Sequence, residues 1–163
     1  MPVTAVYAGS FDPPTNGHVW MIQQGAALFD RLVVATGTNP EKRYTYPLTQ
    51  RMRWLKVLCQ PFDNVELTHF ENLFLARYAE TIAARVVIRG IRNEADYAFE
   101  RAMRHINGDL HPGLTTVFLL PPRELVEISS SMVKGLIGPS GWQDVVRQYV
   151  PEAVFRDLAA EHP

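Results

Sequence analysis

The chain has 163 residues, of which 47% are hydrophobic and 20% are charged, and its formal net charge is −1. These values are typical of a compact domain that buries its own core, and they exclude a disordered chain. The balanced charge excludes a broad basic surface for nucleic acid or an anionic membrane, but a small anionic substrate needs only a local cluster of cations.

Apolar, partly β-branched runs alternate along the chain with longer segments of helical spacing. In chain order we expect a strand over 4–8, a helix from about Thr15, a strand over 31–36, a helix over 48–60, a strand over 65–70, a helix over 73–83, a strand over 85–88, a helix over 94–107, a strand over 115–120, and helices that begin at Ser129 and Pro151. The first helix is expected to carry Val19, Ile22, Ala26 and Phe29 on one face.

This alternation predicts an α/β fold, a doubly wound five-stranded parallel sheet with helices on both faces. We expect a single domain over residues 1–163 with a C-terminal helical segment from about 129. If strand four returns beside strand one, the ends of these two strands border one crevice. The two ends carry Gly9-Ser10-Phe11 and Arg89-Gly90-Ile91-Arg92, so we expect a phosphate-binding crevice there.

The run from Gly9 to His18 (GSFDPPTNGH) has the properties of a phosphate-binding turn. Gly9 allows close approach of the backbone, and Ser10 offers an amide and a hydroxyl. The helix that begins near Thr15 points free amides into the crevice, and His18 in its first turn can donate to a phosphate oxygen. The alternative is a turn, an N-cap and a buried histidine. No GxGxxG or GxxxxGK[ST] motif occurs, which excludes a dinucleotide fingerprint and a P-loop.

Three cations and a serine cluster extend this pattern. Lys42, taken alone, is an ordinary solvated loop lysine. Arg89 and Arg92 at a strand end suit phosphates, because arginine binds them bidentately, although Arg92 could instead pair with Asp96. The run 129–131 (SSS) is an N-cap cluster and also a possible seat for β- and γ-phosphates.

The form TNGH within GSFDPPTNGH resembles the T/HxGH signature of the nucleotidyltransferase superfamily that includes class I aminoacyl-tRNA synthetases. It is most similar to the bacterial-type phosphopantetheine adenylyltransferases. Lys42, the run 89–92 (RGIR) with Asp96 and Glu100 downstream, and the run 128–134 (ISSSMVK) match in order, so the resemblance covers about residues 4–134. It implies a Rossmann-like nucleotidyltransferase fold and transfer of AMP from ATP to 4′-phosphopantetheine, which gives dephospho-coenzyme A and pyrophosphate.

The resemblance also implies a role for each matched residue. His18, Lys42 and Arg92 would be catalytic. The ATP-binding residues would be Ser10, Phe11, His18, Gly90, Ile91, Arg92, Glu100, Leu125, Val126, Glu127, Ile128, Ser129, Ser130 and Ser131, of which 125–131 would line the adenine pocket. The residues that bind phosphopantetheine would be Ser10, Lys42, Phe74 and Arg89. Glu100 could otherwise be an exposed partner of Arg104, and Phe74 could belong to the core of its helix.

Two departures from the family pattern concern the nucleotide. Ser10 stands where many members have threonine, which keeps the hydroxyl, and Leu125-Val126-Glu127 replaces a stretch that is often aromatic. Mg²⁺ is expected to bridge phosphates, largely through water. No protein metal ligands are expected, because His69, His105, His111 and His162 lack metal-ligand spacing. By family analogy we expect a homo-oligomer, a hexamer, with coenzyme A as a feedback ligand.

The location and the rival functions complete these expectations. Cys59 is the single cysteine, so no intrachain disulfide forms, and the sequence shows neither a secretory leader nor an apolar run of the roughly 20 residues that span a bilayer. We expect a cytoplasmic protein without nucleic-acid or membrane partners.

The alternative functions are a nicotinate or nicotinamide mononucleotide adenylyltransferase, a cytidylyltransferase acting on a phospho-alcohol, and a non-catalytic adenine-nucleotide sensor. The combination of TNGH, RGIR and ISSSMVK favours the pantetheine substrate.

Overall fold

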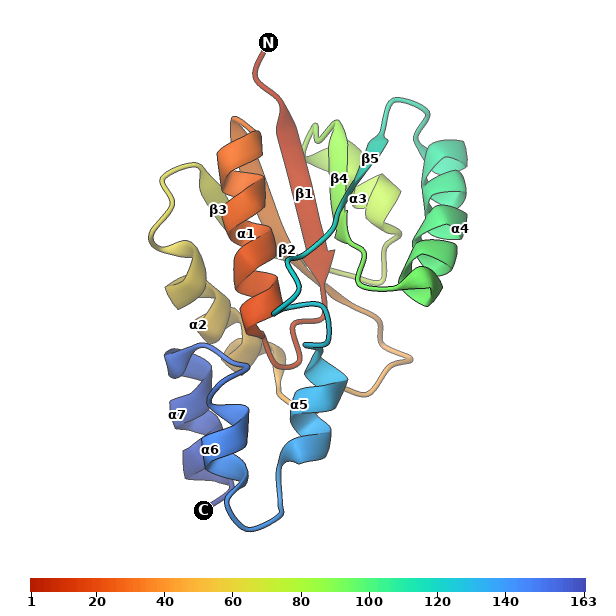
Figure 1. Ribbon diagram of the computed structural model, residues 1–163. Coiled ribbons are helices and arrows are strands. Elements are labelled where there is room, and N and C mark those ends of the chain that lie inside the picture. Colours follow the sequence, from red (N-terminus) through yellow and green to blue (C-terminus); the bar gives the residue numbers. More distant parts are fainter.

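A parallel sheet of five strands organises the computed structural model, which describes residues 1–163 (Figure 1). The elements in chain order are β1 (Thr4–Gly9), α1 (Asn16–Leu28), β2 (Arg31–Thr38), α2 (Leu48–Cys59), β3 (Val65–Glu71), α3 (Leu75–Thr81), β4 (Val86–Gly90), α4 (Glu94–Leu110), β5 (Thr115–Leu119), α5 (Ser130–Leu136), α6 (Trp142–Val146) and α7 (Glu152–Glu161). The strand order is β3-β2-β1-β4-β5. The doubly wound parallel sheet is confirmed, and β4 does return beside β1.

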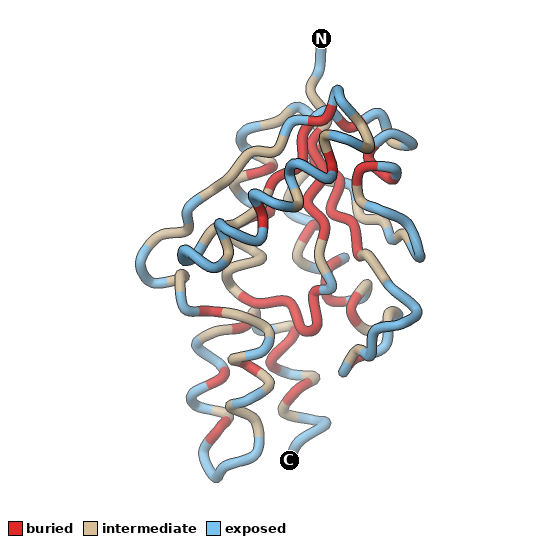
Figure 2. The backbone as a smooth tube through the Cα atoms, turned by 90° about the vertical axis from the view of Figure 1, so that its right-hand side faces the viewer, coloured by how far each residue is buried: buried red, intermediate tan, exposed pale blue.

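The strands are continuous apolar runs because helices cover both faces of the sheet. Ala5 and Tyr7 of β1 point into a core cluster that also contains residues of α1 and α2. Val6 and Ala8, which point the opposite way, join a second cluster with residues of α3. Buried stretches run along β1 and β2 and through residues 11–15 of the loop after β1, and Figure 2 shows the buried segments in the interior of the molecule.

The buried face of α1 differs from the one expected. Met21, Ile22 and Gly25 are buried, whereas Val19 and Ala26 are only partly so. Phe29 lies beyond the end of the helix. The reason is close packing at Gly25, where an added Cβ would lie 2.8 Å from a side-chain carbon of β2. Because Gly25 has no side chain, α1 packs close against the sheet at this point, and the buried face of the helix is centred on Gly25.

The helices α5, α6 and α7 form a third cluster below the carboxyl ends of the strands (Figure 1). Trp142 and Val146 of α6 are buried there against α7 and against Trp54 of α2. The short helix α6 had no counterpart among the expected elements, because its single turn is too brief to show a helical period. None of the helices is long and apolar enough to cross a membrane.

Candidate active site

Two cavities open at the carboxyl ends of β1 and β4. The first cavity has a volume of about 330 Å³ and lies toward α1 and the start of α5. The second cavity has a volume of about 470 Å³ and lies toward the loop between β2 and α2. Both are lined by Ala8, Gly9, Ser10, Arg89 and Ser130, so they adjoin along the strand tips.

His18 lines the first cavity, and its hydrogen bonds determine its tautomer. The backbone N–H of Thr15 donates to Nδ1 of His18 over 2.9 Å. Because a backbone amide can only donate, Nδ1 must accept, and in the neutral ring the hydrogen is then on Nε2. Burial, together with the positive charges of Arg92 and Arg89, lowers the pKa of His18 to about 4. At neutral pH the imidazole is therefore uncharged and has one N–H to donate.

Hydrogen bonds within the protein already occupy some of the polar groups at the start of α1. The backbone N–H of Asn16 donates to the carbonyl of Tyr149 over 2.9 Å, and its side-chain nitrogen donates to the carbonyl of Gln148 over 3.0 Å. The free amides expected at this helix start therefore do not include that of Asn16. The tail between α6 and α7, to which the sequence assigned no chemistry, instead anchors the TNGH turn.

Phe11 lies at the site with its ring directed into the core. The residue has a positive φ of 48° and is 1% exposed. Its ring packs edge-on against His18 and Tyr7, with centroid distances of 5.1 and 5.4 Å. Phe11 lines neither cavity, so the arrangement of the cavities gives no support to its expected contact with ATP. Through this edge-on contact the Phe11 ring packs against the imidazole of His18.

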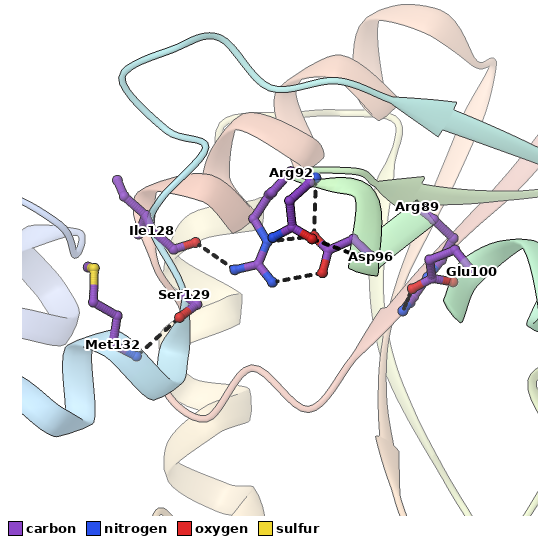
Figure 3. A network of polar contacts seen from close by, with 8 residues as sticks. Arg89, Arg92, Asp96, Glu100, Ile128, Ser129 and Met132 are labelled. Atoms are coloured by element: carbon purple, nitrogen blue, oxygen red, sulfur yellow. Dashed lines mark hydrogen bonds and ion pairs between the residues drawn. The ribbon is translucent and has the colours of Figure 1, made fainter. Parts of the chain in front are cut away.

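Arg89 and Glu100 form an ion pair in the wall of the first cavity (Figure 3). Nη2 of Arg89 donates to Oε1 of Glu100 over 2.6 Å, and Nη1 donates to the carbonyl of Ala8 over 2.7 Å. Glu100 is 8% exposed, so the alternative of an exposed glutamate paired with Arg104 is wrong. The Nε–H of Arg89 and further hydrogens on its terminal nitrogens remain free to bind a phosphate.

Arg92 connects the start of α4 to the loop before α5 (Figure 3). Its Nε and Nη2 donate to the two carboxylate oxygens of Asp96 over 2.9 and 3.2 Å, and Nη1 donates to the carbonyl of Ile128 over 3.3 Å. Burial alone would raise the pKa of Asp96, but the hydrogen bonds from Arg92 outweigh it and the pKa is lowered. The pairing that the sequence left as an alternative is present, and it holds Arg92 beside His18 in the first cavity.

The three serines at the start of α5 differ in what they can still bind. The Ser129 hydroxyl accepts from the N–H of Met132 over 3.1 Å, as an N-cap does, and keeps its own hydrogen. The Ser130 hydroxyl donates to the carbonyl of Pro13 over 2.8 Å, so that hydrogen is already used. Ser131 is exposed and lines the second cavity.

The second cavity is strongly cationic, whereas the first is balanced. Lys42, Arg43, Arg89 and Lys134 line the second cavity together with the single carboxylate of Asp12. In the first cavity two arginines face two carboxylates, Asp96 and Glu100. A dianionic phosphate is therefore attracted more strongly to the second cavity.

The remaining sequence-predicted residues divide into two groups. Gly90, Leu125 and Ile128 line the first cavity with the residues described above. Ile91, Val126, Glu127 and Phe74 line neither cavity. Phe74 caps α3 and is 65% exposed, so the alternative of a core aromatic is wrong; its neighbour Leu73 lines the second cavity instead.

Sequence reasoning missed a polar cluster at the second cavity, which Asp12 itself lines. Asp12 is 5% exposed and accepts from the backbone N–H groups of Thr45 and Tyr46, both over 2.8 Å. Arg51 of α2 is 1% exposed and donates to the carbonyls of Ser10 and Tyr46 over 2.7 and 3.0 Å. An arginine in an amphipathic helix gives no local signal that it will be buried, so nothing in the sequence pointed to Arg51.

Comparison with known proteins gives a family, close relatives and a shared fold. The sequence model of a family described as Cytidylyltransferase-like matches residues 6–136. Phosphopantetheine adenylyltransferases from Neisseria meningitidis serogroup C and Chromobacterium violaceum are each 54% identical to this chain, covering 99% and 94% of it and 95% and 94% of their own sequences. The Plasmodium falciparum nicotinic acid mononucleotide adenylyltransferase complexed with NaAD matches with a TM-score of 0.69 at 12% identity, over 99% of this chain and 96% of its own. At that identity the likeness concerns the fold alone.

Proposed function

The chain belongs to the phosphopantetheine adenylyltransferases of the cytidylyltransferase-like family, and from this we propose how its two adjoining cavities perform the reaction. The enzyme transfers the adenylyl group of ATP to 4′-phosphopantetheine, giving dephospho-coenzyme A and pyrophosphate, in coenzyme A biosynthesis. ATP occupies the first cavity and the phosphate of phosphopantetheine enters the second, so that the reacting groups meet at their common wall. The observation that carries this arrangement is the pair of cavities sharing Ser10 and Arg89.

The reaction is a direct in-line attack of the phosphopantetheine phosphate on the α-phosphorus of ATP. A phosphate monoester is already largely ionised at neutral pH, so no strong general base is required. Catalysis then depends on holding the two phosphates in line and on stabilising the charge that develops on the α-phosphate.

His18 supplies the hydrogen-bond donor for that charge. Its Nδ1 is occupied by Thr15, so the remaining N–H on Nε2 is the one that can donate to an α-phosphate oxygen. The low pKa keeps the ring neutral at working pH. The N–H of a neutral imidazole donates a hydrogen bond to the developing oxyanion without giving up its proton. The edge-on contact with Phe11 limits rotation of the ring.

Each cation of the site interacts with particular phosphate groups of the two substrates. Arg92, fixed by Asp96, lies beside His18 and shares the charge of the α-phosphate. Lys42 on its exposed loop neutralises both the attacking phosphate and the α-phosphate. Arg89 lines both cavities and binds the pantetheine phosphate with the N–H groups that Glu100 and Ala8 leave free. Glu100 then acts by holding Arg89, besides the contact to the nucleotide that the family pattern implies.

The other binding residues are assigned by their place around the cavities. Leu125 and Ile128 provide apolar surface for adenine in the first cavity. The Ser129 hydroxyl is able to donate to the β- and γ-phosphates. Phe11 and Ile91 line neither cavity, so their expected contacts with ATP rest on the family pattern. For Val126, Glu127 and Phe74 the proposed contacts rest on the family pattern alone.

The donor set fits a magnesium ion that is carried by the nucleotide. The chain has no group of three or more histidine, cysteine or acidic side chains that could hold a metal, and the carboxylates of Asp96 and Glu100 face arginines. Mg²⁺ keeps most of its water and binds substrate phosphates readily. When bound, it supplies neutralisation of phosphate charge, while Ser129 and Arg92 of this chain orient the phosphates themselves.

Four broader expectations remain proposals. We propose that residues 1–163 act as one nucleotidyltransferase domain and that the protein is cytoplasmic. We also propose a homo-oligomer, a hexamer, and feedback binding of coenzyme A in the same cavities. Light scattering tests the assembly, and competition of coenzyme A with ATP or phosphopantetheine tests the feedback.

The assignment is tested by measuring pyrophosphate release with ATP and either phosphopantetheine or nicotinate mononucleotide. Release with phosphopantetheine alone supports the proposed acceptor. Release only with nicotinate mononucleotide would favour the rival acceptor. Binding of ATP with no release in either case would favour the nucleotide sensor.

A further inference from the structure

The loop between β2 and α2 is held at both ends, although its middle, with Lys42, is exposed. At its start, the backbone N–H of Asn39 donates to the hydroxyl of Tyr44 over 2.8 Å, and the N–H of Lys42 donates to the carbonyl of Asn39 over 2.9 Å. At its end, Asp12 accepts from the backbone N–H groups of Thr45 and Tyr46. Only a short excursion that carries Lys42 is left between these anchors.

One side chain contacts the anchors of this loop and the Ser10 turn together. The Arg51 guanidinium donates to the carbonyl of Tyr46 and to the carbonyl of Ser10. It also lies 4.3 Å from the centre of the Tyr44 ring, a cation–π contact. Through these contacts Arg51 fixes the distance between the turn after β1 and the Lys42 loop.

The burial of Arg51 is not explained by an ion pair. Its side chain forms none of the ion pairs in the molecule, and Asp12 directs its oxygens to backbone amides and to Lys134. The nearby Asp12 carboxylate attracts the guanidinium without bonding to it, yet burial still lowers the pKa of Arg51, so the buried charge is only partly compensated. A residue kept under such conditions has a use that an apolar residue of similar size would not provide.

We propose that Arg51 is a positioning residue for adenylyl transfer, which holds the Ser10 turn and the Lys42 loop, both of which line the second cavity, at the separation that the acceptor phosphate requires. This inference rests on the function proposed for Ser10 and Lys42. The planar guanidinium suits the task because its donors point in fixed, different directions while its face stacks on Tyr44. Lysine has one ammonium group and cannot reproduce the three contacts together.

The test compares Arg51→Lys with Leu55→Ala, a core substitution on the same helix. Leu55 is completely buried in the cluster between α2 and the sheet and lines neither cavity. Both variants should lower the melting temperature. Arg51→Lys should in addition lower kcat/KM for phosphopantetheine by roughly 10-fold to 100-fold, because small misplacements of reacting groups are costly, with KM for ATP little changed. Leu55→Ala should leave both values near wild type per folded molecule.

A double-mutant cycle connects Arg51 to the residue through which it acts. If Arg51 acts by placing Lys42, Arg51→Lys should cost much less in the Lys42→Ala background than in the wild type. Additive losses would overturn the inference, as would equal losses for ATP and phosphopantetheine that follow the loss of melting temperature. Where Arg51→Lys does not fold, Tyr44→Leu removes the stacked ring and the hydroxyl bound to Asn39, and should give the same selective loss for phosphopantetheine.

The same measurements separate this inference from the proposed function. A Lys42→Ala variant that is defective with phosphopantetheine beside a normal Arg51→Lys variant would overturn only the role of Arg51. A Lys42→Ala variant with unchanged kinetics would overturn the role of Lys42 itself, and the inference with it. Selective losses in both variants, with little additional loss in the double mutant, support both.

Discussion

In the proposed mechanism, replacing His18 by alanine removes a single hydrogen-bond donor from the place where charge develops. Loss of one such donor in other enzymes costs about 2.7–4 kcal/mol in the transition state. At 1.36 kcal/mol for each factor of ten, kcat of His18→Ala should fall by roughly 10²–10³. The affinity for ATP should change far less, because Arg92 and the start of α5, which also line the first cavity, are unchanged.

The same substitution has a structural cost that must be separated from the kinetic one. Thr15 is buried, and its backbone N–H loses its acceptor when Nδ1 of His18 is removed. An unsatisfied buried amide costs about 1–3 kcal/mol of folding free energy. His18→Gln is the matched control, because a glutamine at this position of a helix can accept from the N-cap amide and restore stability.

The assay combines pyrophosphate release at saturating substrates, calorimetric titration with ATP, and thermal unfolding of the three proteins. We expect His18→Ala to be slow and destabilised, and His18→Gln to regain stability while its less well placed amide leaves kcat between alanine and wild type. A folded His18→Ala protein with wild-type turnover would refute the donor role of the imidazole. A loss of ATP affinity with kcat unchanged would show that His18 binds the ground state as strongly as the transition state.

Three further predictions concern charge and packing. The pKa of His18 is about 4 in the folded protein and 6.5 for an ordinary histidine, so the unfolded chain takes up the proton first as the pH falls. Wild type should therefore lose stability relative to His18→Gln between pH 6.5 and pH 4, by at most about 1.4 kcal/mol per pH unit. If urea unfolding gives the same pH dependence of the free energy of unfolding for both proteins, the depressed pKa is contradicted. Lys42→Ala should raise KM for phosphopantetheine by roughly tenfold with little effect on KM for ATP, whereas Glu41→Ala, whose side chain lines neither cavity, should change neither; an effect confined to ATP would be inconsistent with the assignment. Gly25→Ala should destabilise the protein by about 1–3 kcal/mol in chemical denaturation, since its Cβ would lie 2.8 Å from a leucine methyl of β2, while Gly108→Ala in α4, with its nearest contact at 3.5 Å, should be neutral or stabilising; the opposite order would disprove the close packing of α1.

The sequence alone determined the frame of this molecule and the place of its site. Long apolar runs such as residues 31–36 are readable as buried parallel strands because both faces of the sheet exclude water. The return of strand four beside strand one was an assumption drawn from the rules of doubly wound sheets, and the structure confirms it. Gly9 to His18 and Arg89 to Arg92 then had to meet at one edge, since the carboxyl ends of neighbouring parallel strands lie together.

The tertiary structure decided which partner each polar side chain has. Arg89 pairs with Glu100, and Asn16 is held by the tail at Gln148 and Tyr149, across separations in sequence that no local pattern encodes. Arg51 is buried because two loops close over it, although its helix gives it no local sign of burial. Hydrophobic periodicity shows only which face of a helix or strand is buried and which is exposed to water. Hydrogen bonds between loops depend on how several elements close together, and therefore only the folded chain fixes them.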